Sequence, residues 1–196
     1  ISKYSVLKKD KFCVLFSPTW GQSSLASRMG DEILNLLSKK TDWDIIFRPH
    51  PQSLLVEKDM INRFQEKYKD SNITFDFDTD NMKSLSSADI MITDFSGITF
   101  EFSFLFEKPV IFSVQNKNED IYEASWLDKP TWKNDILKSI GTEVTKENVM
   151  NLISIIEQAS SKTDEIKKAK DLLWQKQNEG AKNITEFLIN KQKEVA

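Results

Sequence analysis

The sequence predicts an α/β fold: a doubly wound, mainly parallel, Rossmann-like sheet of about five or six strands, followed by C-terminal helices. Short apolar segments alternate with segments of helical spacing between residues 12 and 112. Several of the short segments are apolar throughout, as strands covered on both faces are. Parallel strands are joined by right-handed crossovers, so the helices between them are expected on both faces of the sheet.

Five strands are expected in the first part of the chain, each bounded by polar residues or by proline. They cover residues 12–16, 43–47, 73–75, 90–93 and 110–112. The segments between them predict helices from Leu25 or Asp31 to Ser38, and over residues 54–68, 82–88 and 97–106. The last of these helices is apolar on nearly every side, so we expect it to be buried.

The chain changes character after the fifth strand. Residues 113–142 are polar with scattered aromatic residues and show no clean period, which predicts a long irregular segment of a kind that is often functional. A helix is expected to start at Thr145, and two more at about residues 164–177 and 181–191. Because no repeat or internal boundary is visible, residues 1–196 are expected to form a single domain.

The composition excludes several classes of protein. With 196 residues, 39% of them hydrophobic and 29% charged, the chain is a globular domain and not a disordered segment. Its net charge of −3 argues against nucleic-acid binding driven by bulk charge. Cys13 is the single cysteine, so no intramolecular disulfide can form and we expect this side chain in the core. No apolar run approaches the roughly 18 residues of a membrane span.

Polar clusters follow three of the expected strands, at residues 17–21, 48–51 and 93–97. In a doubly wound sheet, ligands bind beyond the carboxyl ends of the strands, so these clusters should converge on one crevice. The third cluster also precedes a helix, whose N-terminal N–H groups and dipole suit a phosphate. Taken alone, its local chemistry favours an ordinary turn in which Asp94 or Ser96 caps the helix. Together, the clusters have the composition of a diphosphate site.

His50 and Arg48 are the candidate ionisable groups of this crevice. His50 is the only histidine, and the prolines on either side fix its backbone. It can donate to a phosphate oxygen or protonate a leaving group as a general acid; the alternative is a structural hydrogen bond. Arg48 has a fixed charge and can bind phosphate bidentately, or form an ion pair under the loop.

The motifs of other nucleotide enzymes are missing from the sequence. No Gly-x-Gly-x-x-Gly or Walker-type loop is present, so neither NAD binding nor a P-loop ATPase is supported. We expect no metal and no cofactor, because one histidine, one cysteine and scattered acids have no ligand spacing. The alternating Asp76, Asp78 and Asp80 lack the glycine turn and the final Glu of a calcium loop, and are interpreted as a strand edge and turn.

Four segments resemble the C-terminal half of the CDP-glycerol glycerophosphotransferase family, the teichoic-acid primases and polymerases. They are Ser-Pro-Thr-Trp at 17–20, Phe-Arg-Pro-His-Pro at 47–51, the run from Ala88 to Phe102, and Lys-Pro-Val-Ile-Phe at 108–112. The resemblance covers about residues 12–115. It implies a GT-B architecture of two Rossmann-like domains facing across a cleft, of which this chain is the donor-binding half. The chain opens at Ile1 without an initiator methionine, and we expect it to be a fragment that lacks the N-terminal domain.

The resemblance implies transfer of glycerol phosphate, or a related polyol phosphate, from a CDP-linked donor to a hydroxyl of a cell-surface glycan or lipid-linked acceptor, with CMP leaving. His50 would contact the donor diphosphate or aid the departure of CMP, with Thr19 at the cleft edge. The residues expected to line the diphosphate and ribose pocket are Thr93, Asp94, Ser96 and Gly97. The acceptor site and a second catalytic histidine would come from the missing N-terminal domain. We therefore expect this chain alone to bind nucleotide weakly and not to turn over.

The chain departs from the family pattern at two positions and in one segment. Gly97 stands where the family usually has a second Ser, and Glu101 where it has Asp. Residues 113–142 match poorly, which leaves the polyol open between glycerol, ribitol and others. The resemblance also implies a cytoplasmic protein at the inner face of the cell membrane, with peripheral contact outside this chain or on its basic C-terminal helices. The lysines in question are Lys162, Lys167, Lys168 and Lys170.

Two other functions stay open from the sequence. One is a GT-B glycosyltransferase or epimerase in which the same helix N-terminus holds the diphosphate of a UDP-sugar. The other is a non-catalytic interaction module whose nucleotide crevice is vestigial. A preference among nucleotides distinguishes the first from the main hypothesis, and the absence of nucleotide binding distinguishes the second.

Overall fold

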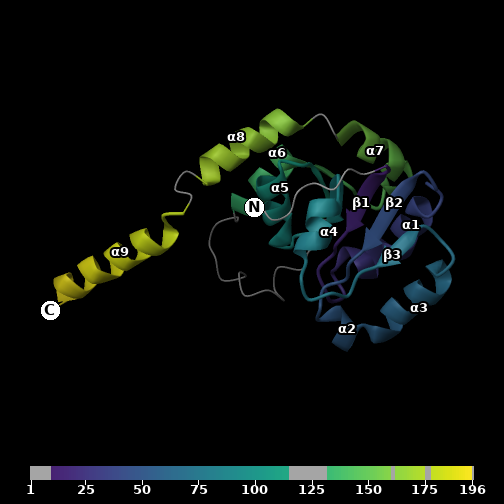
Figure 1. The fold of residues 1–196 in the computed structure, drawn as a ribbon, viewed down its shortest axis with the longest axis horizontal. Coiled ribbons are helices and arrows are strands. Elements are labelled where there is room, and N and C mark those ends of the chain that lie inside the picture. The colour runs from purple at the N-terminus through teal and green to yellow at the C-terminus, as the bar shows by residue number, and fades with distance from the viewer. Residues whose placement is uncertain (1–9, 115–131, 160–161, 175–177, 196) are drawn as a thin grey trace.

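A computed structural model describes residues 10–114, 132–159, 162–174 and 178–195 (Figure 1). Its described part contains one six-stranded sheet, in the order β3-β2-β1-β4-β5-β6, and every neighbouring pair is parallel. The strands are β1 (Phe12–Phe16), β2 (Trp43–Phe47), β3 (Ile73–Phe75), β4 (Ile90–Thr93), β5 (Val110–Phe112) and β6 (Gly141–Glu143). The strand order reverses between β1 and β4, which defines a topological switch point. The predicted doubly wound α/β fold is confirmed.

The described helices cover both faces of this sheet (Figure 1). They are α1 (Leu25–Leu37), α2 (Ser53–Val56), α3 (Lys58–Tyr68), α4 (Met82–Ser87), α5 (Ile98–Phe106), α6 (Trp132–Ile140), the 3-10 turn η2 (Val149–Asn151), α7 (Leu152–Ala159), α8 (Thr163–Leu173) and α9 (Gly180–Val195). Figure 1 shows α9 extending away from the sheet, and its Phe187 and Leu188 side chains are exposed. None of the helices in these ranges is both long enough and apolar enough to cross a membrane.

Two hydrophobic cores result from the alternation of side chains along each strand. Val14 and Phe16 of β1 point to the face covered by α1, α3 and α7. Leu15, between them, points to the opposite face, where it packs with α4, α5, α6 and α8. The predicted burial of α5 is found, since Phe102 and Phe104 are almost fully enclosed. Cys13 is buried, as predicted, in this same β1 strand.

The structure corrects three predictions of secondary structure. The helix expected to start at Thr145 begins only at Val149, as the 3-10 turn η2, and becomes α-helical at Leu152. The helix expected over residues 54–68 is broken at Glu57, which ends α2 and precedes α3. The segment 113–142 is not irregular throughout, because α6 and β6 occupy its end; residues 115–131 lie outside the described part. β6 was missed because Gly-Thr-Glu has no apolar pattern. A Cβ atom at Gly141 would lie 2.5 Å from the Val110 carbonyl oxygen, so glycine allows this close approach to β5.

Candidate functional site

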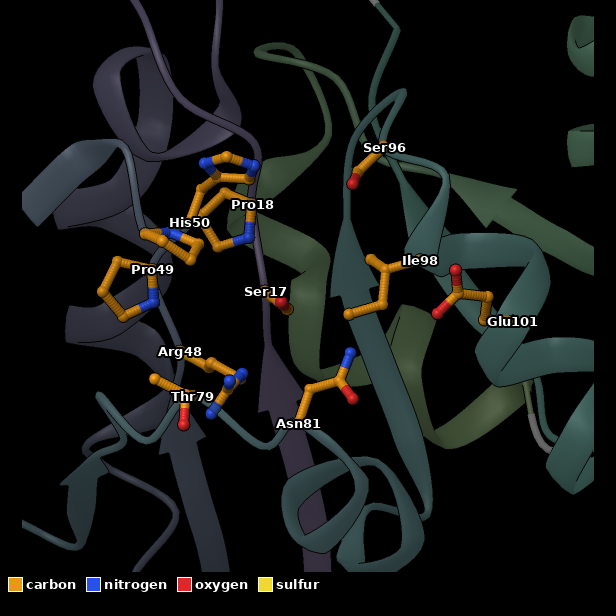
Figure 2. A pocket seen from close by; sticks show the side chains of 11 residues that line it. Ser17, Pro18, Arg48, Pro49, His50, Thr79, Asn81, Ser96, Ile98 and Glu101 are labelled. Atoms are coloured by element: carbon orange, nitrogen blue, oxygen red, sulfur yellow. The ribbon is translucent and has the colours of Figure 1, made fainter.

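A cavity of about 250 Å³ opens at the carboxyl ends of β1, β2 and β4, at the switch point of the sheet (Figure 2). Each of the three predicted polar clusters contributes to it. The lining residues are Ser17, Pro18, Arg48, Pro49, His50, Pro51, Thr79, Asn81, Ser96, Ile98 and Glu101. Among the predicted site residues, Arg48, His50 and Ser96 therefore line the cavity. Thr19, Thr93, Asp94 and Gly97 do not.

Arg48 lines the cavity from the end of β2 and is ion-paired at the same time. Its Nη1 lies 2.6 Å from a carboxylate oxygen of Asp76, and its Nη2 donates to the Asp78 carbonyl oxygen at 2.5 Å. Burial would raise the pKa of Asp76, but hydrogen bonds from Ser84, the Asp78 N–H and Arg48 lower it overall. The Asp76–Asp78 turn thus holds the guanidinium in place and neutralises part of its charge.

His50 is half-buried between two prolines and faces the same cavity. The Gln52 N–H donates to its Nδ1 at 3.1 Å, so Nδ1 carries a lone pair and the neutral ring has its proton on Nε2. Burial lowers the pKa of His50, while the Glu57 carboxylate acts in the opposite direction. A bound anion would favour the imidazolium form further. An imidazolium would carry its second proton on Nδ1 and would lose the hydrogen bond from the Gln52 N–H, whereas the neutral ring can already donate to a phosphate oxygen through Nε2–H.

Ser96 and the start of α5 form another wall of the cavity. Figure 2 shows the Ser96 side chain pointing into the cavity. Gly97 occupies the N-cap position, and within the described residues no side chain caps the helix. Neither Asp94 nor Ser96 therefore makes the cap that an ordinary turn would have. The Thr99 hydroxyl donates to the Ser96 carbonyl oxygen at 2.7 Å, which fixes the loop while the N-terminus of α5 stays accessible.

Thr93 and Asp94 lie behind the cavity wall, where both are fully buried. The Thr93 hydroxyl donates to the Ser17 carbonyl oxygen at 2.8 Å. The Asp94 carboxylate accepts from the Thr19 N–H at 3.0 Å and from the Leu25 N–H at 3.0 Å. Burial raises the pKa of Asp94 to about 6, against the effect of these N–H groups. Both side chains are thus engaged in holding the loop between β1 and α1.

Several lining residues were missed by the sequence interpretation. Thr79 and Asn81 belong to the loop between β3 and α4, and they follow a strand end just as the recognised clusters do. The same rule of strand ends would have found them. Glu101, noted only as a family departure, places a carboxylate on the first turn of α5. In the described ranges, no group of three or more His, Cys, Asp and Glu side chains could hold a metal ion.

The chain has recognisable relatives. The family model described as CDP-Glycerol:Poly(glycerophosphate) glycerophosphotransferase matches residues 1–188. The minor teichoic acid biosynthesis protein GgaB of Bacillus subtilis (strain 168) is 30% identical over 119 residues, which are 58% of this chain and 12% of GgaB.

Solved structures share the fold. The wall teichoic acid polymerase TagF has a TM-score of 0.56 and 22% identity, covering 95% of this chain and 44% of that one. The C-terminal CMP-Kdo binding domain of WaaA from Acinetobacter baumannii has a TM-score of 0.52 and 6% identity, covering 86% of this chain and 92% of that one. The chain thus spans less than half of the TagF chain and has the fold of one Rossmann-like half of a GT-B enzyme. With nearly its whole length matched by the family model, the chain belongs to the CDP-Glycerol:Poly(glycerophosphate) glycerophosphotransferase family.

Proposed function

We propose that this chain supplies the donor site for transfer of glycerol phosphate, or a related polyol phosphate, from a CDP-linked donor to a hydroxyl group. The acceptor is a cell-surface glycan or a lipid-linked glycan, in teichoic-acid-type polymer synthesis. Membership of the family supports the transfer reaction. The observation that supports the donor site is the cavity itself, in which His50, Ser96 and the N-terminus of α5 converge.

The cavity suits the anionic part of such a donor. The diphosphate would lie between His50 and the start of α5, where N–H groups, the helix dipole and the Ser96 hydroxyl favour negative charge. Figure 2 shows Glu101 and His50 on opposite walls of the cavity. A carboxylate repels phosphate but accepts hydrogen bonds from hydroxyl groups, so Glu101 would face a hydroxyl-bearing part of the donor. Arg48 supports the wall, because Asp76 already holds its guanidinium.

The reaction requires little covalent work from the protein. The acceptor oxygen forms a bond to the phosphorus of the polyol phosphate, while the bond from that phosphorus to the bridging oxygen breaks and leaves its electrons on CMP. His50 would stabilise the departing phosphate oxygen by a hydrogen bond from Nε2–H, or would protonate it from the imidazolium form, after Nδ1 has taken up a proton from solvent, and return to the neutral imidazole. The proton of the acceptor hydroxyl would pass to a base outside this chain. Such a site accelerates the step mainly through position and charge neutralisation.

Isothermal titration calorimetry tests this function directly. CMP, CDP-glycerol, CDP-ribitol and a UDP-sugar are titrated into the 196-residue chain. We expect cytidine nucleotides to bind preferentially, and His50→Ala to weaken binding about tenfold because one charge-assisted hydrogen bond is lost. Glu66→Gln, at an exposed position on α3, is the matched control and should change nothing.

The outcomes of this titration separate the three hypotheses. Tighter binding of the UDP-sugar would favour a sugar transferase or epimerase. An absence of binding at millimolar nucleotide, with the fold intact by circular dichroism, would favour an interaction module. The affinity for CDP-ribitol, compared with that for CDP-glycerol, indicates which polyol phosphate the donor carries.

The remaining partners also belong to this proposal. An N-terminal domain would supply the acceptor site, so the chain alone binds nucleotide without turnover. The protein would act in the cytoplasm at the inner membrane surface.

The basic patch expected on the last helices is weakened in the structure. Lys162 donates to the Gly141 carbonyl oxygen at 2.7 Å, and Lys170 lies 2.6 Å from the Glu107 carboxylate. Peripheral contact is therefore proposed for other parts of the protein.

A further inference from the structure

Glu57 interrupts the helix that the sequence predicts, because its backbone leaves the helical conformation. Its backbone N–H donates to the Ser53 carbonyl oxygen at 2.9 Å, and its own carbonyl accepts from the Ile61 N–H at 3.1 Å. The backbone angles, φ −123° and ψ 28°, are not helical. The break separates a one-turn α2 from α3 and fixes Glu57 at the joint.

The Glu57 carboxylate holds the loop between β1 and α1. Its Oε1 accepts from the Gly21 N–H at 3.1 Å and from the Ser27 hydroxyl at 2.9 Å. Gly21 has φ +92°, a conformation that a side chain would disfavour, so the N–H direction depends on glycine. Trp20 precedes it, and the Trp20 ring centroid lies 6.5 Å from that of His50. By holding Gly21, Glu57 keeps an aromatic ring next to the histidine.

The same turn of chain connects Glu57 to His50. The Ser53 N–H donates to the His50 carbonyl oxygen at 2.9 Å, and the Ser53 carbonyl accepts from the Glu57 N–H. The intervening Gln52 N–H orients the imidazole through Nδ1. Helix α2 is therefore a short rigid connection between the histidine and the carboxylate.

One oxygen of Glu57 has no evident structural purpose. Its Oε2 is buried, and the described part of the chain offers it no hydrogen-bond partner. A buried, unpaired carboxylate oxygen is unfavourable, and such groups are expected where function requires them. The charge acts on His50, since the carboxylate raises the pKa of the imidazole against the effect of burial. Glu57 is not among the residues that line the cavity, whose charged members are Arg48, which follows β2, and Glu101, on α5.

We propose that Glu57 is a positioning residue for His50, which holds the Trp20–Gly21 loop beside the histidine and places a negative charge near the imidazole. The proposal rests on the proposed function, in which His50 meets the departing phosphate. A nearby carboxylate increases the fraction of the imidazolium form, which is a stronger hydrogen-bond donor to that oxygen than the neutral ring.

Because His50 is the only histidine in the sequence, the effect of the Glu57 charge on its pKa can be measured directly. The ring Cε1–Hε1 resonance of His50 is followed by NMR as the pH of untagged, nucleotide-free chain is varied. Glu57→Gln retains an acceptor for Gly21 and Ser27 but removes the charge, so we expect the pKa of His50 to fall. Glu66→Gln is the control and should leave the titration midpoint in place. Because no nucleotide is present, this measurement is independent of the donor hypothesis. An unchanged midpoint in folded Glu57→Gln would overturn the proposal.

Glu57→Asp tests the positioning part and serves as a second variant. The shorter side chain keeps the charge but withdraws from Gly21 and Ser27. We expect faster hydrogen exchange of the Gly21 amide and about fivefold weaker binding of CMP, as for the loss of one hydrogen bond. Equal Gly21 protection in the variant and the parent would show that Glu57 does not hold the loop. If the parent binds no CMP, the donor hypothesis fails while the exchange result still decides the role of Glu57.

Discussion

The two halves of the segment from Thr93, at the end of β4, to Glu101, in the first turn of α5, have similar polar residues but opposite surroundings. Thr93 and Asp94 are fully buried and bond to the loop that follows β1. Ser96 and Glu101 face the cavity, and Gly97 is exposed at the start of α5. A run of hydroxyl and carboxyl residues at a strand end therefore has two roles, one in holding neighbouring loops and one in facing a ligand. The boundary between them lies at Phe95.

The largest effect is expected from the buried half. Asp94→Ala leaves the buried N–H of Leu25 and the partly buried N–H of Thr19 without an acceptor. We expect the free energy of unfolding to fall by about 3 kcal/mol, since each unpaired buried donor costs about 1–3 kcal/mol. Urea unfolding at pH 7.5, followed by circular dichroism, measures it.

Ser96→Ala is the matched control from the exposed half. Its stability should stay within about 0.5 kcal/mol of the parent. If Asp94→Ala unfolds at the urea concentration of the parent, the two halves do not differ in the way their burial indicates.

The pH dependence of stability gives a second test of the buried half. The folded pKa of Asp94 is about 6, above its ordinary value of 3.8. Between these values the folded chain binds more protons than the unfolded chain, so its stability falls as pH rises from about 4 to 6 and is level above. Relative to Asp94→Asn, which does not titrate, the parent should lose on the order of 2–3 kcal/mol over this range.

Urea unfolding of both proteins at a series of pH values measures that difference. The other carboxylates are common to the two proteins and cancel. A parent that gains stability relative to Asp94→Asn as pH rises would mean that the N–H groups outweigh burial.

The sequence predicted the fold well because short apolar runs alternate with segments of helical spacing, and because polar residues or proline end these runs. It also predicted that clusters from three strands meet, because the carboxyl ends of parallel strands share one edge. It could not predict that Asp94 faces inward, because the residue type does not show whether the carboxylate accepts hydrogen bonds from backbone N–H groups or contacts a ligand. Only the position of Thr19 and Leu25, far along the chain, decides that.

The break at Glu57 was hidden for a related reason. Leu55, Ile61, Phe64 and Tyr68 have helical spacing on both sides of it, so the apolar pattern predicts one continuous helix. At the break, the Glu57 carboxylate accepts hydrogen bonds from Gly21 and Ser27, which lie about thirty positions or more away in the sequence. Local propensity does not encode such contacts.

In the exposed half, Ser96→Ala should reduce affinity without affecting stability. The lost hydroxyl is a donor to a charged phosphate, so we expect CMP or CDP-glycerol to bind about tenfold more weakly. Calorimetry on the parent and the variant measures this. Equal affinities would remove Ser96 from the proposed diphosphate site and would leave the N-terminus of α5 and His50 as its remaining donors.

The smallest and most specific effect is expected at Gly97. Its angles, φ −62° and ψ −28°, are open to any residue, and an added Cβ would meet no protein atom within 4 Å. Gly97→Ala should therefore change the free energy of unfolding by no more than about 0.5 kcal/mol, because reduced freedom of the unfolded chain offsets the poorer N-cap residue. A phosphate seated on the first N–H groups of α5 would, however, touch the new methyl group, and we expect about threefold weaker CMP binding by calorimetry. If Gly97→Ala binds CMP as tightly as the parent while Ser96→Ala binds it more weakly, the phosphate contacts the side chains of the loop and lies away from the helix N-terminus.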